Sequence, residues 1–202
     1  MNFLFAVDHA RNDESAVKGL TFTGEIISDS DISAVDFDSV TFRRCRFVQC
    51  NFSGACFADC SFDGCDISSC NLSDSFWKNC TLTDCKADGA GFVHVIMRHT
   101  HITRTPCRYA NFTRSVWEDS TFAGCDFREC ALNEMKIRRC TFDSIDFTQA
   151  DFFRTPLKSV DLSHCEIDGI LVSDTRNELQ GLKISAAQAP YIAAMLGVKI
   201  IS

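Results

Sequence analysis

The sequence predicts an all-β solenoid, a chain that turns a corner every five residues around a filled interior. Three observations support this fold class. A large apolar residue recurs every five residues from Phe22 to Val172, a small residue recurs two positions before each of them, and the other three positions are polar. A period of five matches neither the α-helix nor the flat, half-buried strand, so the chain must bend regularly.

The five-residue frame is unbroken over 31 central positions, and 25 of them hold Phe, Ile or Leu. Glu25 is the single charged residue among the central and small positions of these units. Burying an unpaired charge is costly, so both positions are expected to face inward. The remaining centres are Trp77, Ala87, Met97, Cys107, Trp117 and Val172.

Cysteine occupies the small inward position in eleven of its thirteen occurrences. Free cysteine behaves as a small hydrophobe, so we interpret these residues as core filler, with Cys56 pointing outward. A zinc knuckle is disfavoured because no C-x-x-C occurs. Stacked cysteines would lie about 4.8 Å apart, close enough for a disulfide, but a cytosolic setting disfavours oxidation. No metal or cofactor is expected. The eleven are Cys45, Cys50, Cys60, Cys65, Cys70, Cys80, Cys85, Cys125, Cys130, Cys140 and Cys165.

The units "CNFSG", "CSFDG", "CDFRE" and "ADFFR" resemble the A(D/N)Lxx consensus of the pentapeptide-repeat proteins. The resemblance covers about three quarters of the chain. It implies a right-handed quadrilateral β-helix with four pentapeptides per coil and about eight coils.

Four sides per coil would stack residues that are 20 positions apart, and the residue sizes support this number. One column would then contain Trp77, Met97 and Trp117, and the opposite column the small Ala87 and Cys107. Such size compensation is what a close-packed core of constant volume requires.

We divide the chain into an N-terminal cap (1–19), the repeat solenoid (20–174) and a C-terminal helix with a tail (175–202). Ser185 and Gln188 form a capping-box pattern that predicts a helix start near Ala186, and Gly197 is a natural helix stop. The helix either covers the last coil or also pairs with a second copy. Its surplus apolar surface favours a homodimer, with an interface formed by Tyr191, Ile192, Met195, Leu196, Val198 and Ile200.

The C-terminal segment is similar to the C-terminal module of the Qnr and MfpA proteins in Leu179-Gln180-Gly181, Lys183, Gln188-Ala189 and Leu196-Gly197. This resemblance implies a homodimer that mimics duplex DNA and binds DNA gyrase, and often topoisomerase IV. The implied outcome is protection from quinolones or natural gyrase poisons, as resistance or self-immunity. Because the frame is unbroken from 22 to 172, we expect no large loop of the kind found in Qnr proteins of Gram-negative bacteria. This favours gyrase binding over quinolone rescue.

Acidic residues concentrate on two adjacent faces of the expected solenoid. The net charge of −7 argues against direct nucleic-acid binding, which needs a basic surface. Sorted by the 20-residue period, the face centred on Ile27, Phe47 and Ile67 has net charge −4 and the next has −3, while the other two have about −1 and +1. We expect the partner to bind the first of these, through Asp29, Asp66, Asp88, Asp126, Glu129, Asp146, Glu166 and Asp168.

No catalytic constellation stands out, so we expect no enzyme. His94, His99 and His101 lie close in sequence, but we expect surface histidines rather than a metal site. With no evident signal peptide and no apolar run of membrane length, we expect a cytoplasmic protein with no membrane contact. The alternative function is a non-catalytic scaffold that binds some other protein.

Overall fold

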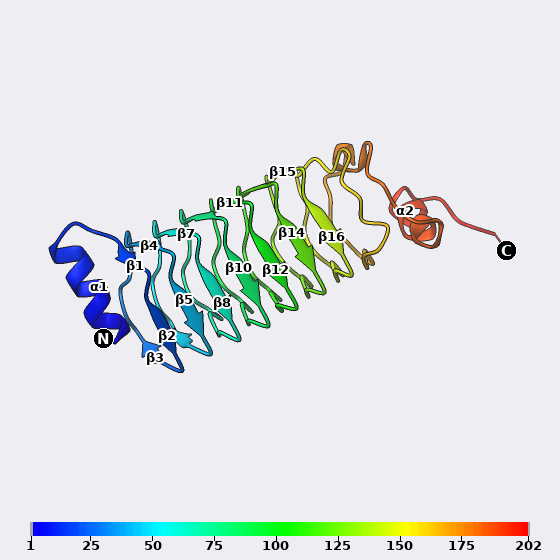
Figure 1. Ribbon diagram of the computed structural model, residues 1–202. Coiled ribbons are helices and arrows are strands. Elements are labelled where there is room, and N and C mark those ends of the chain that lie inside the picture. The colour runs from blue at the N-terminus through cyan, green and yellow to red at the C-terminus, as the bar shows by residue number, and fades with distance from the viewer. Residues whose placement is uncertain (1, 202) are drawn as a thin grey trace.

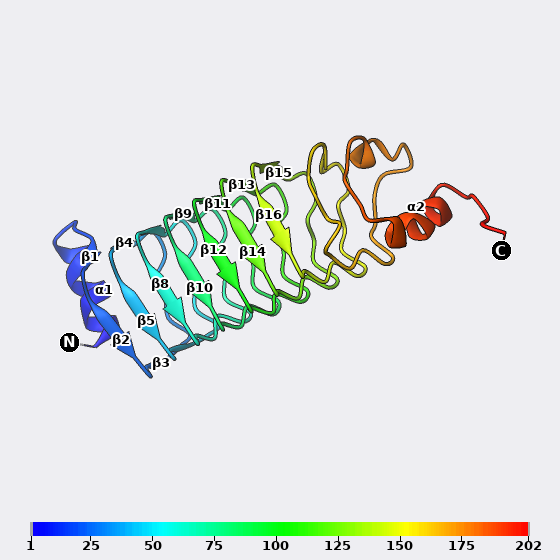
Figure 2. The same ribbon diagram turned by 45° about the vertical axis from the view of Figure 1, so that its right-hand side comes forward.

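The protein is an elongated rod of stacked coils with a helix at each end (Figures 1 and 2). We describe it from a computed structural model, which describes residues 2–201. Helix α1 (Phe3–Asn12) lies at one end, the solenoid forms the body, and α2 (Ala189–Met195) lies beyond the last coil.

Two sides of the solenoid are seven-stranded parallel sheets. Strands within each sheet are 20 residues apart, so each coil contributes one strand to each sheet. The first sheet contains β1 (Val17–Lys18), β4 (Asp36–Asp38), β7 (Cys56–Ala58), β9 (Phe76–Lys78), β11 (Ile96–Arg98), β13 (Val116–Glu118) and β15 (Lys136–Arg138). The second contains β2 (Thr21–Thr23), β5 (Thr41–Arg43), β8 (Ser61–Asp63), β10 (Thr81–Thr83), β12 (His101–Thr103), β14 (Thr121–Ala123) and β16 (Thr141–Asp143).

The other two sides are held mainly by single bridges. One begins as the short pair β3 (Ile26–Ser28) and β6 (Arg46–Val48), and then continues as isolated bridges from Arg46 to Glu166. The predicted four-sided β-solenoid is therefore confirmed. The strand ladders of the two sheets span about six turns, fewer than the eight coils expected. On the other two sides, single bridges keep the 20-residue register as far as Glu166 and Leu171.

The core consists of the large and small inward residues that the five-residue frame predicts on each side of the coil. Trp77 pairs with Phe57 and Met97, and Trp117 pairs with Met97 and Ile137, so the predicted stacking column is confirmed. All of these centres are buried except Ile137, which is partly exposed. Aromatic rings stack between coils, as in Phe37–Phe57 with centroids 5.0 Å apart and Phe92–Phe112 at 4.6 Å. Such stacking adds to the burial energy of each ring.

Each corner is made by the residue two positions after a centre. From Gly19 to Gly169 this residue has a positive φ at every unit except His164. Glycine is free of strain in this conformation, whereas other residues are disfavoured in it. The corners therefore explain why glycine and aspartate recur at this position of the repeat.

Proline ends the first sheet. The strand residue that would follow Lys136 in its column is Pro156, which has no N–H to donate to the neighbouring coil. The ladder stops at β15, and Ile137 and Cys140 are left partly exposed. The first sheet thus ends at one residue that the five-residue pattern tolerates.

Helix α1 closes the N-terminal end of the core. The Phe3 side chain is fully buried among the rings of Phe22, Phe37, Phe42 and Phe47, at centroid distances of 5.2 to 6.0 Å. Glu25, the one charged residue in an inward position, is partly exposed there and accepts a hydrogen bond from the Phe3 N–H at 3.0 Å. A carboxylate at a helix N-terminus also interacts favourably with the helix dipole.

The C-terminal segment forms two 3₁₀ turns, Asn177–Leu179 and Ala186–Gln188, before α2. The capping box of Ser185 and Gln188 is present, but the α-helix starts at Ala189 rather than near Ala186. Pro190 lies in the first helical turn, where its missing N–H costs nothing. Gly197, with φ +75°, follows the helix as predicted.

Candidate functional site

The face centred on Ile27, Phe47 and Ile67 is called the acidic face. In its middle, arginines form ion pairs with the aspartates. Arg108 Nη2 lies 2.9 Å from Asp88, and its Nε lies 3.7 Å from Asp126. Arg128 lies 2.6 Å from Asp126 and 3.5 Å from Asp146. Burial opposes ionisation of Asp126, but the hydrogen-bonded Arg128 and the nearby Arg108 hold its pKa below the usual value. This part of the face is a ladder of ion pairs.

The expected acidic residues therefore fall into two groups. Asp66 joins the paired group through Arg46, whose Nε is 3.7 Å away. The others have no lysine or arginine nitrogen within 4.0 Å in the part of the chain that the structure describes, and three of them lie in the last three coils. This unpaired group comprises Asp29, Glu129, Glu166 and Asp168.

The neighbouring face, centred on Ile32, Phe52 and Leu72, is also partly neutralised. Arg114 lies 2.9 Å from Glu134, and this ion pair lowers the pKa of the glutamate. Asp151 accepts a hydrogen bond of 2.6 Å from the Asn133 amide and has no lysine or arginine nitrogen within 4.0 Å among the described residues. Together with the unpaired acids of the acidic face, Asp151 makes the C-terminal coils the part of these two faces with least cationic compensation.

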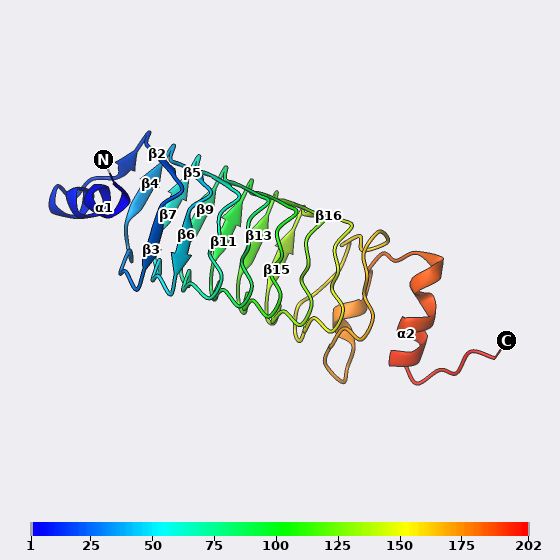
Figure 3. The same cartoon turned by 90° about the horizontal axis from the view of Figure 1, so that it is seen from below.

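The C-terminal segment exposes apolar surface. Among the residues proposed for a dimer interface, Ile192 and Met195 are partly buried against the solenoid core. The other four point away from it, with exposed fractions of 41% for Tyr191, 54% for Leu196, 56% for Val198 and 63% for Ile200. Figure 3 shows α2 and the tail beyond the last coil, so this surface faces outward from the end of the rod.

Glu178 anchors the segment and was not foreseen from the sequence. Its residue is only 4% exposed, and its carboxylate accepts hydrogen bonds from the Arg154 N–H at 2.8 Å and the Ser173 hydroxyl at 2.8 Å. Burial opposes its ionisation, but these hydrogen bonds, with others from the backbone, hold the pKa of Glu178 below its usual value. In the sequence, Glu178 is a single glutamate beyond the end of the repeat frame, and nothing there distinguishes it from an exposed surface residue.

Gln188 substitutes for the backbone of a further coil. Its Nε2 donates to the carbonyls of Leu162 at 2.8 Å and Cys165 at 2.5 Å, while its Oε1 accepts from the Ser185 N–H at 2.7 Å. Buried carbonyls without partners are costly, so one side chain closes the corner of the last coil.

Comparisons with known proteins agree with this architecture. Two family models match the chain, a pentapeptide repeat region over residues 55–126 and the pentapeptide repeats (eight copies) over residues 30–68. The chain is a pentapeptide-repeat protein.

Among solved structures, this pentapeptide-repeat protein is similar to a trypsin-treated variant of QnrB1, a plasmid-mediated fluoroquinolone resistance protein. The two are 26% identical with a TM-score of 0.52, over 93% of this chain and 99% of the other. It is also similar to HetL, a pentapeptide-repeat protein involved in heterocyst differentiation regulation from the cyanobacterium Nostoc sp. strain PCC 7120, at 11% identity and a TM-score of 0.41, over 91% and 94% of the chains. No curated protein matches the sequence significantly.

The cysteines of this pentapeptide-repeat protein are free thiols. Those in the small position are buried, except the partly exposed Cys140, and several donate to a carbonyl of the preceding coil. Cys130 does so to Cys107 at 2.8 Å, as Ser115 does to Phe92 at 2.7 Å. The small position thus accepts residues that combine small size with a hydrogen-bond donor, which the sequence analysis did not recognise.

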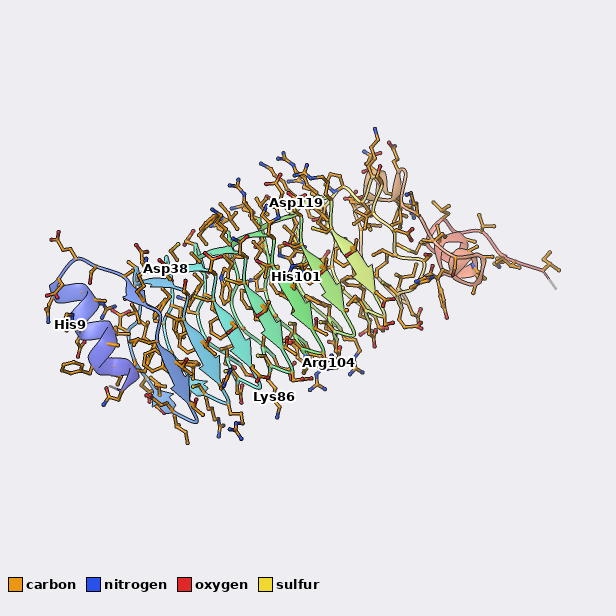
Figure 4. The ribbon with its side chains drawn as sticks, in the orientation of Figure 1. His9, Asp38, Lys86, His101, Arg104 and Asp119 are labelled. Carbon is orange, nitrogen blue, oxygen red and sulfur yellow. The ribbon has the colours of Figure 1, made fainter. Side chains whose placement is uncertain are left out.

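The three histidines point outward, and the structure does not bring them together. His94 lies 3.2 Å from Asp74, and His101 lies 2.6 Å from the Thr121 hydroxyl, on the second sheet (Figure 4). Among residues 2–201, no group of three or more His, Cys, Asp or Glu residues is arranged to hold a metal ion.

Hollows occur on the surface of the rod. One of about 500 Å³ lies beside the C-terminal segment, where the Glu178 carboxylate already accepts hydrogen bonds from the N–H groups of Arg154 and Ser173. The residues that line the hollow are Phe153, Arg154, Pro156, Ser173, Asp174, Thr175, Asn177 and Glu178.

Within residues 2–201, no helix is both long and apolar enough to cross a membrane.

Proposed function

We propose that this protein binds a type II topoisomerase, DNA gyrase or topoisomerase IV, in place of DNA, and so changes the response of the enzyme to quinolones or natural poisons. The observation that carries the proposal is the similarity to QnrB1, a fluoroquinolone resistance protein, over nearly the whole length of both chains.

The charge distribution supports a narrower contact region than the whole acidic face. Acids that are already paired with arginine offer little net attraction to a basic surface that normally holds phosphates. The unpaired Glu129, Glu166 and Asp168 therefore carry the main contact, with Asp151 beside them. Asp66, Asp88, Asp126 and Asp146 contribute through shape and weaker electrostatics, because each shares an arginine. Asp29 lies at the far end of the same face.

A homodimer through the C-terminal segment would place these acids at the centre of one long rod. The bridged column from Asp31 to Leu171 has eight rungs, which at about 4.8 Å each give roughly 38 Å per protomer, so a tail-to-tail dimer exceeds roughly 75 Å. The exposed Tyr191, Leu196, Val198 and Ile200 supply the apolar surface, and Ile192 and Met195 would brace the helix from below. Light scattering tests this. The Leu196→Lys/Ile200→Lys variant should be monomeric, while Tyr109→Lys, which changes an exposed apolar residue on the side of the rod, should leave the dimer intact.

A second candidate function is a scaffold that binds another protein. The ion-pair ladder of Arg108 and Arg128 favours it, because mixed charge suits a protein partner as well as a DNA-binding surface.

The test of the proposed function is a gyrase assay with purified protein, with and without a fluoroquinolone. The expected result is inhibition of DNA supercoiling at high protein concentration or relief of drug-induced cleavage. If neither effect occurs at any concentration with either topoisomerase, the scaffold is the better account.

A further inference from the structure

The first sheet carries a stripe of apolar side chains on its outer surface. Cys56, Phe76, Ile96 and Val116 occupy one column in consecutive strands, with Phe76 paired in register to Cys56 and to Ile96, and Val116 paired to Ile96. Each of the four is partly exposed. Neighbouring strands are about 4.8 Å apart, so the four side chains form one continuous strip.

The backbone does not require apolar residues in this column. The equivalent column of the second sheet has the same parallel register and is hydroxyl-rich. It contains Thr21, Thr41, Ser61, Thr81, His101, Thr121 and Thr141. A sheet of this geometry therefore folds with polar residues at these positions, and the apolar strip calls for another explanation. Contiguous exposed apolar surface in a soluble protein commonly marks a binding site.

Cationic side chains border the strip. Glu118 lies within 4.0 Å of three arginines, with Arg98 at 3.2 Å, Arg139 at 2.9 Å and Arg138 at 4.0 Å, and Arg139 also lies 2.6 Å from Asp119. Arg98 also lies 6.0 Å from the centre of the Phe76 ring. Lys78, Arg98, Lys136, Arg138 and Arg139 against Asp59, Glu118 and Asp119 leave this patch at +2, in a chain of net charge −7. Lys78 and Lys136 have no carboxylate within 4.0 Å in the described part of the chain.

We propose that this basic-apolar face, formed by β7, β9, β11, β13 and β15, docks an acidic amphipathic helix of another protein, with the helix axis along the rod. Apolar residues three or four positions apart advance about 5 Å along a helix, which matches the spacing of the strip. The surplus positive charge selects acidic flanking residues. Nucleic acid fits less well, because interfaces with DNA are polar and the centre of this strip is not.

The location leaves the two binding surfaces independent. Centres of the first sheet and of the acidic face differ by ten residues, which is two corners of a four-sided coil, so the faces are opposite. In Figure 4, Asp119 at the edge of the first sheet and Lys86 on the acidic face project from opposite edges of the rod. The helix could therefore bind while the acidic face holds another partner, and this inference does not rest on the proposed function.

Fluorescence anisotropy with synthetic peptides tests the proposal. The probe is a labelled 15-residue peptide with Leu at every third and fourth position and Glu elsewhere. It should bind the full-length protein, and about tenfold more weakly after Lys136→Glu/Arg138→Glu or after Phe76→Thr/Ile96→Thr, which introduces the residue found on the second sheet. Circular dichroism and thermal melting establish that each variant is folded.

The control is Lys86→Glu, a single charge reversal on the acidic face, which should leave the affinity within about twofold. The same peptide with Lys in place of Glu should not bind. The proposal is overturned if the acidic peptide shows no binding up to about 1 mM, if Lys86→Glu weakens binding as much as the double reversal, or if a duplex DNA of similar length binds this face more tightly than the peptide.

Discussion

The guanidinium of Arg128 lies 2.6 Å from the carboxylate of Asp126 and within 3.5 Å of Asp146 in the next coil. One arginine side chain thus neutralises carboxylates of two successive coils, on a face that is strongly acidic by residue count. Net charge alone therefore overstates how closely the middle of this face resembles the phosphate backbone of DNA.

This pairing leads to a prediction about which acids bind the topoisomerase. The triple variant Glu129→Gln/Glu166→Gln/Asp168→Asn should inhibit supercoiling at least about tenfold less well than the wild type, because it removes uncompensated charge. Asp88→Asn, which removes a carboxylate already shared with Arg108, should change inhibition by less than about threefold. Equal effects of the triple variant and the Asp88 variant would show that the contact is spread along the face.

At the corners of the coil, replacing another residue by glycine should stabilise the fold. Ala34 is exposed and has φ +54°, so Ala34→Gly should raise the free energy of unfolding by about 0.5–1 kcal/mol, although glycine usually destabilises regular structure. Gly24→Ala is the reverse control. An added Cβ there meets nothing within 4 Å, so its expected loss of about 1 kcal/mol comes from the backbone alone. Chemical denaturation measures both, and a destabilising Ala34→Gly would contradict the strain assigned to the corners.

Glu178 predicts a pH-dependent stability of the C-terminal segment. Glu178→Gln should lower the free energy of unfolding by about 1–2 kcal/mol at neutral pH, because charged hydrogen bonds to Arg154 N–H and Ser173 are lost. The folded-state pKa of Glu178 is lowered, so its contribution is present above the ordinary glutamate pKa and is lost as the pH falls through the folded-state value. The difference between wild type and variant should therefore vanish in acid. A difference that persists at pH 2 to 3 would mean that the carboxylate charge is not what holds the segment.

The buried thiols predict slow and ordered alkylation. Burial raises the pKa of Cys130 to about 12 and that of Cys165 to about 11, and neither side chain is open to solvent. Under native conditions at pH 8, iodoacetamide should label the partly exposed Cys56 and Cys140 first, whereas all thirteen thiols react in denaturant. Mass spectrometry of the modified peptides gives the order. Early labelling of Cys130 would indicate that the coils open readily.

The repeat made the body of the fold readable from the sequence. Every unit repeats the same large and small inward positions, so the stacking of Trp77 on Met97 followed from counting alone. The ends were harder, because each depends on residues that occur once. Pro156 stops a sheet through a missing N–H, and Glu178 and Gln188 hold the last turn through hydrogen bonds to distant backbone.

The sequence predicted which faces carry the acidic residues, but not which of these residues are paired with arginine. The 20-residue period places Arg108 beside Asp88 and Asp126, yet only side-chain positions reveal that one arginine serves both. The apolar strip was also present in the sequence, as Cys56, Phe76, Ile96 and Val116 at a normally polar position. It becomes apparent only when the columns of the four faces are compared.

Competition with DNA for gyrase is the most direct test of the central claim. The purified protein is titrated into a complex of gyrase with fluorescently labelled duplex DNA, and the bound DNA is followed by anisotropy. Displacement of the DNA by the wild type, and much weaker displacement by Glu129→Gln/Glu166→Gln/Asp168→Asn, is the predicted result. Gyrase that keeps its DNA while it binds the protein, or that binds no protein at any concentration, would contradict the claim.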